Sequence, residues 1–267
     1  MIHDLRTILE GWEFEPGKIS VRKIIGRDGR EKIQTRVDLG LLQLEAGGRP
    51  DGTRPMGHES YLEHCEHRLR THQRRRGSDA GFRLSVEDCR ELLYESHLYY
   101  QRYLSLFVLE DFDGVERDTS RNLRAIDLAR LYAGAARERE AFLSQLAYVR
   151  MMNVRGRVYG AMQAMSYDTA LELTDDGIRE LESLDDESEA PAGERPELRV
   201  LHELRDEVIQ RMPPDSPPRL RHELERAVAG EDYARAAKLR DLLAALDHAK
   251  PPRAPTAARR SRGRDGH

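Results

Sequence analysis

The sequence lacks long apolar runs. Of its 267 residues 39% are hydrophobic and 34% are charged, and the mean hydropathy is -0.73. No stretch approaches the roughly 18 uninterrupted apolar residues that a membrane span requires. The opening segment, residues 1–18, carries acids such as Asp4, Glu10 and Glu15 among short apolar groups, so it also lacks the continuous apolar centre of a secretion signal. We therefore expect a cytoplasmic chain of one or two soluble domains, with no membrane partner.

Cysteine is scarce, and the charges nearly balance. Cys65 and Cys89 are the only cysteines, too few for a disulfide framework or a four-cysteine zinc site, which agrees with a reducing compartment. Lysine and arginine number 44 against 48 aspartates and glutamates, so the net charge is -4. The chain as a whole is not a polycation built for phosphate, and any contact with nucleic acid must be local.

The familiar sequence signatures of catalysis are absent as well. There is no Gly-x-x-x-x-Gly-Lys-Ser/Thr loop for nucleotide phosphates and no Gly-x-Ser-x-Gly turn for a nucleophilic serine. No nucleophile has an evident partner along the sequence, and the many carboxylates cannot be paired as acid and base from sequence alone. We therefore expect a protein that is not an enzyme and that uses no cofactor.

Residues 1–48 predict an N-terminal β-ribbon. Apolar and polar residues alternate on both sides of Asp28-Gly29, which is typical of two antiparallel strands joined by a turn. A strict two-residue turn would place Ile25 beside Lys32 and mix apolar with charged side chains on one face. A register shifted by one, with a three-residue connection or a bulge, sets Ile25 opposite Ile33 and gives one apolar face, so we prefer it.

Helical periodicity dominates residues 58–185, after a loop rich in Gly, Pro, Asp and Thr at residues 46–57. Ser60 and Ser85 are each followed three residues later by an acid, a spacing typical of helix starts. In the helix after Ser85 an aromatic stripe recurs at helical spacing, and we interpret it as core rather than as a pocket. The stripe consists of Tyr94, Tyr99, Tyr100, Tyr103 and Phe107. The pattern predicts a mainly α protein in which a β-hairpin packs on an antiparallel helical domain.

Hydrophilic and proline-rich segments follow this domain. Residues 186–217 form a predicted linker that contains one helix and ends in a proline-rich break, which is stiff because proline restricts the backbone. Residues 248–267 consist largely of prolines and arginines with almost nothing apolar, so we expect a disordered basic tail. Residues 218–247 lie between these two segments as a separate helical unit.

Residues 218–247 predict two short helices joined at Gly230. Leucines and alanines recur at helical spacing on both sides of this glycine, so each helix has one apolar stripe. Gly230 suits the left-handed conformation that closes a helix, and Asp232 can cap the next helix by accepting from its exposed amides. Ala236 and Ala237 are small enough to let the helix axes approach closely. The predicted product is a C-terminal αα-hairpin.

This segment resembles the UVR motif, the helical hairpin of the excision-repair proteins UvrB and UvrC, of ClpC-type chaperone ATPases and of McsA-type kinase activators. The resemblance rests on Leu224, Ala227, residues 231–233, Ala236-Ala237 and residues 239–241. It does not extend to the rest of the chain, which has neither a nucleotide-binding loop, nor paired Cys-x-x-Cys zinc sites, nor a segment like the UvrC nuclease. In those relatives the hairpin pairs with another protein, so the resemblance implies a docking function here.

Size supports the same interpretation. Folds of fewer than about 40 residues seldom bury enough apolar surface to stand alone, so a hairpin of this length gains stability by packing against a second surface. That surface is either a partner, which includes a second copy of this chain, or the chain's own helical domain. The predicted partner-binding residues are Leu220, Leu224, Ala227, Tyr233, Ala236, Ala237, Leu239, Arg240 and Leu243.

An alternative function is that of a nucleic-acid-associated accessory factor, possibly in excision repair. Its candidate contact residues are Arg22, Lys32 and Arg36 on the second face of the ribbon and Arg259, Arg260 and Arg262 in the tail. Basic residues on a ribbon also prevent edge-to-edge pairing, so we favour a solvated face for the ribbon and for the second cluster, residues 74–76. Trp12 and Phe14, the aromatic residues before the ribbon, are candidates for a third strand or a lid.

Histidines cluster near the start of the helical domain. His64 and His67 lie on neighbouring turns of a predicted helix, with His58 before them and His72 after them. Their spacing matches no established zinc pattern. Cys65 lies on the apolar side of the same helix, so we expect a core cysteine, a solvated histidine face and no metal site.

Overall fold

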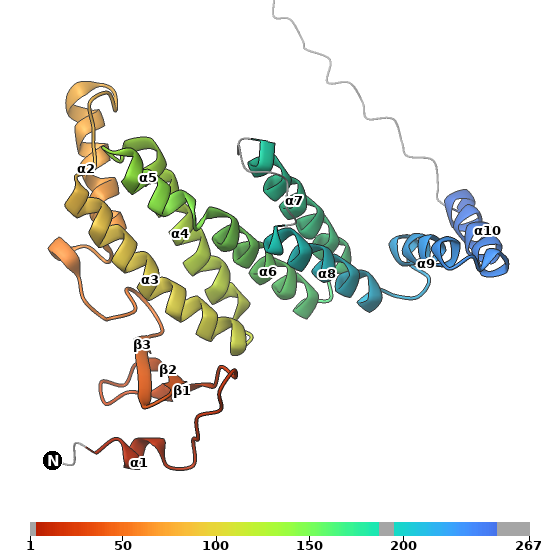
Figure 1. Cartoon of the computed structure of the whole chain (residues 1–267), viewed down its shortest axis with the longest axis horizontal. Coiled ribbons are helices and arrows are strands. Elements are labelled where there is room, and N and C mark those ends of the chain that lie inside the picture. Colours follow the sequence, from red (N-terminus) through yellow and green to blue (C-terminus); the bar gives the residue numbers. More distant parts are fainter. Residues whose placement is uncertain (1–3, 187–194, 250–267) are drawn as a thin grey trace, which may run out of the picture. The chain divides into compact units, whose positions relative to one another are not determined.

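The computed structural model describes residues 4–186 and 195–249 of the chain (Figure 1). The chain divides into two compact units, Met1–Val208 and Ile209–His267. The first unit begins with the short helix α1 (Arg6–Leu9) and the strands β1 (Val21–Ile25), β2 (Glu31–Val37) and β3 (Gly40–Glu45). A 3-10 turn, η1 (Pro55–Gly57), precedes its long helices. These are α2 (Tyr61–Arg76), α3 (Val86–Val108), α4 (Phe112–Tyr132), α5 (Ala136–Leu143), α6 (Leu146–Gln163), α7 (Tyr167–Asp186) and α8 (Pro196–Arg211).

The strands form one antiparallel sheet in the order β1-β2-β3. The preferred register is wrong: Ile25 lies opposite Glu31, and Lys23 lies opposite Ile33. The amide of Gly26 donates to the carbonyl of Arg30 at 2.8 Å, so the pairing shifts in the other direction and leaves Ile25 71% exposed. The three-residue connection that we expected is present between Gly26 and Arg30.

The third strand comes from the end of the predicted second strand. β2 stops at Val37, and β3 resumes at Gly40, which pairs with it. Trp12 and Phe14 belong to no strand. The Trp12 ring instead stacks under the guanidinium of Arg22, whose Cζ atom lies 4.0 Å from the ring centroid. Trp12 therefore acts as a lid on the sheet.

The sheet packs on α3 and α4 through its apolar face. Ile33 and Leu44 are buried against Leu106 and Val115. The Thr35 hydroxyl lies 2.7 Å from that of Ser105, which adds a polar contact between β2 and α3. The N-terminal β-ribbon on a helical domain is therefore confirmed.

Two helices of the first unit, α2 and α3, begin where their capping residues predict. The Ser60 hydroxyl accepts from the amide of Glu63 at 3.1 Å, and Ser85 forms a reciprocal capping box with Asp88 at 2.9 and 3.0 Å. The α3 stripe is core at Tyr99 and Tyr103, whereas Tyr94 is 53% exposed. Gly156 brings α6 close to α4, since an added Cβ would lie 2.9 Å from Val115.

The segment expected to be a linker contributes to the helical core. Within residues 186–217, α8 places Leu201, Leu204 and Val208 in the same buried cluster as Met152 of α6 and Leu181 of α7. The boundary between the two units falls after Val208 and thus inside this segment. In the described part of the chain no helix has the length and apolar character that crossing a membrane would need.

The second unit contains the predicted αα-hairpin. Its helices are α9 (Pro217–Ala229) and α10 (Tyr233–Ala249), drawn in blue in Figure 1. Pro217 and Pro218 occupy the first positions of α9, where a missing amide hydrogen costs nothing. The three-stranded sheet, helices α2 to α8 and this hairpin together confirm the predicted mainly α fold.

Candidate protein-interaction site

The hairpin closes on a small core of its own. The side chains between its helices are Leu220, Leu224 and Ala227 from α9 and Ala236, Leu239 and Leu243 from α10. All six are predicted partner-binding residues, and the structure brings them together. Four are buried, whereas Leu224 and Leu243 are partly buried. These side chains hold the two helices to each other, so the accessible side chains lie on other faces of the hairpin.

The turn between the helices has a different left-handed residue from the predicted one. Gly230 has φ -87°, whereas Glu231 has φ 58°. The amide of Asp232 donates to the carbonyl of Ala227 at 2.8 Å, and that of Glu231 donates to Val228 at 3.1 Å. This is the Schellman pattern, with Glu231 at the left-handed position. The Asp232 carboxylate accepts from the amide of Arg235 at 3.0 Å, so the predicted cap of α10 is confirmed.

Glu223 joins the two helices electrostatically. Its carboxylate lies 3.0 Å from Arg235 of α10 and 3.3 Å from Arg219 of its own helix. The hydrogen bond from Arg235 is the main cause that holds the pKa of Glu223 below its ordinary value. Arg219 also donates to the carbonyls of Gln210 and Met212 at 3.0 and 2.7 Å, which ties the proline-rich break to α9.

One face of α10 is exposed and partly apolar. Tyr233 is 68% exposed, and Ala237 and Arg240 are exposed as well. With the exposed Ala244 they follow at steps of four, three and four residues, which places them on one helix face. We call these four residues the α10 strip. The strip contains the three predicted partner-binding residues that lie outside the hairpin core.

Other exposed apolar side chains surround the hairpin core. Leu242 is 54% and Leu246 is 38% exposed, and their spacing of four residues places them on the flank of α10 away from the strip. Val228, in the last turn of α9, is 52% exposed. None of the three is a predicted partner-binding residue, because a helix wheel alone does not say which part of an apolar stripe the second helix covers.

The three nucleic-acid candidates of the ribbon, Arg22, Lys32 and Arg36, are engaged by other groups of the chain. Arg22 lies over Trp12 and donates to the side chain of Gln34 at 2.9 Å. Lys32 is 6% exposed and forms ion pairs with Asp28 and Glu45, so the expected solvated face is wrong at this residue.

Arg36 donates to the carbonyls of Trp12 and Gly40 at 2.9 and 2.7 Å. Like Arg22 and Lys32, it therefore stabilises the ribbon and its lid. The other nucleic-acid candidates, Arg259, Arg260 and Arg262, lie outside the described residues.

The histidine cluster forms by ring packing. The ring centroid of His58 lies 5.2 Å from that of His64 and 5.3 Å from that of His67. Burial is the main cause that lowers the pKa of His64. Among the described residues no group of histidine, cysteine and carboxylate side chains has an arrangement that could hold a metal ion. Cys65 is fully buried, as its position on the apolar helix side predicts.

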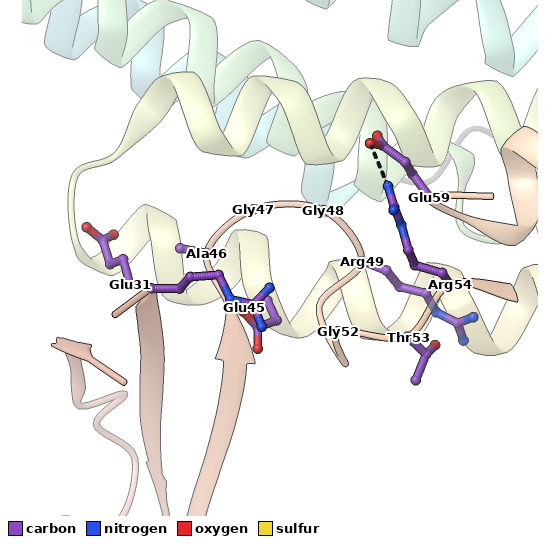
Figure 2. A pocket seen from close by; sticks show the side chains of 11 residues that line it. Glu31, Glu45, Ala46, Gly47, Gly48, Arg49, Gly52, Thr53, Arg54 and Glu59 are labelled. Carbon is purple, nitrogen blue, oxygen red and sulfur yellow. Dashed lines mark hydrogen bonds and ion pairs between the residues drawn. The ribbon is translucent and has the colours of Figure 1, made fainter. Parts of the chain in front are cut away.

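A cavity borders the loop between β3 and α2. Its volume is about 490 Å³, and the glycines of the loop line it together with arginines and glutamates (Figure 2). Charged groups of the lining pair with one another: Arg54 lies 3.3 Å from Glu59, and Arg30 lies 3.8 Å from Glu45. The sequence predicts the loop from its turn residues, but no motif in it indicates a ligand. Pairing among the lining residues makes this cavity part of the scaffold.

A buried charge network lies next to this cavity. Glu95 is fully buried and accepts from the amides of Tyr61 and Leu62 at 2.6 and 3.0 Å, so it caps the start of α2. Arg121 forms an ion pair with the same carboxylate. Burial lowers the pKa of Arg121 to about 9. Glu95 therefore joins α2, α3 and α4, a role that the sequence pattern does not reveal.

Comparison with known proteins concerns the hairpin. Residues 218–249 match the family model UVR, described as the UvrB/uvrC motif, which confirms the resemblance of this segment. No curated protein and no solved structure matches the chain. The match shows a UVR motif at residues 218–249, and UVR motifs are known interaction modules.

Proposed function

We propose that the UVR-type hairpin, residues 218–249, makes this chain a non-enzymatic adaptor that docks to another protein through the α10 strip. The observation that carries the proposal is the division of labour within the hairpin. Six apolar residues close its core, while Tyr233 and its neighbours on α10 remain exposed. A unit with so few core side chains gains stability when a second surface covers its accessible face.

The residue types of the strip suit a helix as partner. Tyrosine is enriched among the residues that dominate binding energy, because it buries a large ring and still offers a hydroxyl. Ala237 and Ala244 have small side chains, which let another helix approach closely. An amphipathic helix of the partner protein could lie along this face.

Arg240 adds a charge preference to the strip. Its guanidinium lies 3.2 Å from the carboxylate of Asp241, and both side chains are 72% exposed. Exposed ion pairs of this kind contribute little free energy, so a partner carboxylate can replace Asp241 at small cost. We therefore propose a partner helix with an acidic residue at the position that faces Arg240.

The non-enzymatic part of the proposal is supported by the sequence alone. The chain contains neither a nucleotide-binding loop nor a nucleophile turn. The scarcity of cysteine supports a reducing, cytoplasmic location. These supports are independent of the α10 strip.

The test is affinity capture of binding proteins by the full-length chain and by two matched variants. Ala237→Glu adds a bulky charge to the strip, and Ala245→Glu makes the same change at an exposed alanine of α10 outside it. We expect Ala237→Glu to weaken binding of the captured protein at least about tenfold, since burying a charged side chain in the contact is costly. Ala245→Glu should bind like the unchanged chain.

Circular dichroism of both variants checks that the helices are retained. Equal binding by the two variants would contradict docking through the strip. Light scattering on the purified chain identifies a second copy as the partner if the mass doubles and Ala237→Glu alone restores the monomer.

A further inference from the structure

A groove with positively charged walls lies beside the last turns of α2. Its volume is about 560 Å³. Arg68, Arg75 and Arg76 of α2 line one side, and Arg83, in the segment that leads into α3, lines it as well. Among the described residues no carboxylate belongs to its lining. We call this feature the basic groove.

Most of these guanidinium groups have no counter-charge. Arg75, Arg76 and Arg83 are exposed, and none of them forms an ion pair with a described residue. Arg83 donates to the carbonyl of Phe82 at 2.7 Å, which leaves its charge uncompensated. Arg68 differs, because it lies 2.6 Å from Asp88. The groove therefore holds a local excess of positive charge on a chain whose net charge is negative.

Stabilisation of the α2 terminus explains only part of this arrangement. Cations in the last turn of a helix interact favourably with its dipole, and Arg75 and Arg76 occupy that turn. Arg83 lies outside the helix and gains nothing from the dipole. Its position in the lining brings a further cation from the loop to the same groove.

The arginines of the groove occupy separate positions, along α2 and in the segment before α3. Arg68 and Arg76 are eight residues apart on α2, which corresponds to about 12 Å at 1.5 Å per residue. A single phosphate would need its donors to converge on one point, as in a bidentate clamp. Several guanidinium groups distributed over one groove instead fit a chain of negative charges, such as the closely spaced phosphates of nucleic acid.

The geometry points to the sugar-phosphate backbone of nucleic acid as the ligand of the basic groove. Phe82 is 6% exposed, and the His72 ring packs edge-on against it with 5.7 Å between the ring centroids. Phe82 therefore provides no platform for stacking a base. The same burial leaves little apolar surface for insertion into a lipid bilayer. Binding is therefore electrostatic and insensitive to base sequence. The lining contains no residue of the hairpin and none of the nucleic-acid candidates named for the ribbon and the tail.

The experiment measures fluorescence anisotropy of labelled oligonucleotides with the full-length chain. Single-stranded and double-stranded probes of two base compositions are titrated between about 50 and 200 mM salt. The groove variant combines Arg75→Gln, Arg76→Gln and Arg83→Gln. The control combines Arg90→Gln, Arg130→Gln and Arg179→Gln, three exposed arginines that lie in ion pairs elsewhere in the first unit. Both variants lose the same charge.

The groove variant should bind at least about tenfold more weakly at the lowest salt. The slope of log affinity against log salt should fall by roughly 2 to 3, because each lost phosphate contact contributes about 0.9. The control should bind within about twofold of the unchanged chain, and probes of both base compositions should bind alike. A further variant that ends at Ala249 should retain the binding.

Several outcomes would overturn the assignment. Absence of binding at low salt removes the site, and equal losses in the groove and control variants show diffuse attraction only. Loss of binding in the shortened variant assigns the affinity to residues 250–267. Binding to vesicles of phosphatidylcholine with phosphatidylserine, without binding to the oligonucleotides, assigns the groove to a membrane surface.

Discussion

Arg102 and Asp118 form a buried ion pair that connects the sheet with the helices. Two of the guanidinium nitrogens lie 2.6 and 2.8 Å from the carboxylate oxygens, and both side chains are 1% exposed. The third nitrogen donates to the carbonyls of Glu45 and Gly48 at 3.0 and 2.8 Å. The pair thereby holds the end of β3 and the following loop against α3 and α4.

Removal of the carboxylate is expected to be costly. Asp118→Ala leaves the Arg102 guanidinium buried without its counter-charge, which lowers the free energy of unfolding by about 3–5 kcal/mol. Asp127→Ala is the matched control on the same helix, because Asp127 forms only an exposed pair with Arg130. Its effect should stay below about 1 kcal/mol. Urea unfolding of both variants measures the difference, and equal midpoints would contradict the structural role of the pair.

Single charged residues are the part of the structure that the sequence predicts least. Lys32 alternates correctly for an outward-facing strand position, yet it is buried between Asp28 and Glu45. Glu45 lies on another strand, so the pairing depends on a register that local alternation does not determine. Glu95 and Arg121 are likewise distant in sequence, and helical periodicity alone gives no reason to bury them.

At the scale of elements, the turn of the hairpin shows what local chemistry determines. The sequence predicts that the first helix of the hairpin ends at Gly230 and that Asp232 caps the second. Accordingly, α9 ends just before Gly230, and α10 begins just after Asp232. The left-handed residue is nevertheless Glu231. A Schellman turn needs its left-handed residue just before the amide that bonds back to Ala227, and that requirement selects position 231 over the neighbouring glycine.

A glycine at position 231 should therefore stabilise the hairpin. Glu231→Gly removes the steric cost of a left-handed conformation and should raise the stability of the α9–α10 unit by about 0.5–1 kcal/mol. The same substitution at Glu225, exposed within α9, should lower it by about 1 kcal/mol. Hydrogen exchange of the amides in α9 and α10 reports both effects. Slower exchange in Glu225→Gly than in Glu231→Gly would refute this account of the turn.

The ribbon shows the limit of pattern reasoning for strands. Alternation predicts two strands and a turn near Asp28-Gly29, and both are present. The preferred register is wrong because it assumes that Ile25 belongs to the same apolar face as Ile33. The contact that decides is long-range: Ile33 packs on Leu106 of α3, and Ile25 stays exposed.

At the scale of the whole molecule, the mainly α class and the terminal hairpin are predictable because both depend on periodicity and capping. The division of the chain is less so. A charged segment rich in glutamate and proline precedes α8 and suggests a linker, yet α8 itself packs with α6 and α7 through Leu201 and Leu204. Composition describes a segment's solubility, but it does not say which helix the core of a unit requires.

The hairpin's partner surface is predictable only in part, for the same reason. The sequence predicts nine partner-binding residues in the hairpin, and the two helices use six of them to cover each other. Tyr233, Ala237 and Arg240 remain accessible on α10. The way the two helices pack decides which candidates are covered and which are accessible. The central claim is that these accessible residues contact another protein molecule.

Photocrosslinking from position 233 tests this claim most directly. A photoreactive phenylalanine analogue replaces Tyr233 in the full-length chain, and a second chain carries the analogue at Ala245, outside the α10 strip. We predict that irradiation in cells links position 233, and not position 245, to a separate polypeptide that mass spectrometry identifies. Crosslinks from position 233 that reach only residues of the same molecule would contradict the adaptor function and assign the hairpin to its own chain.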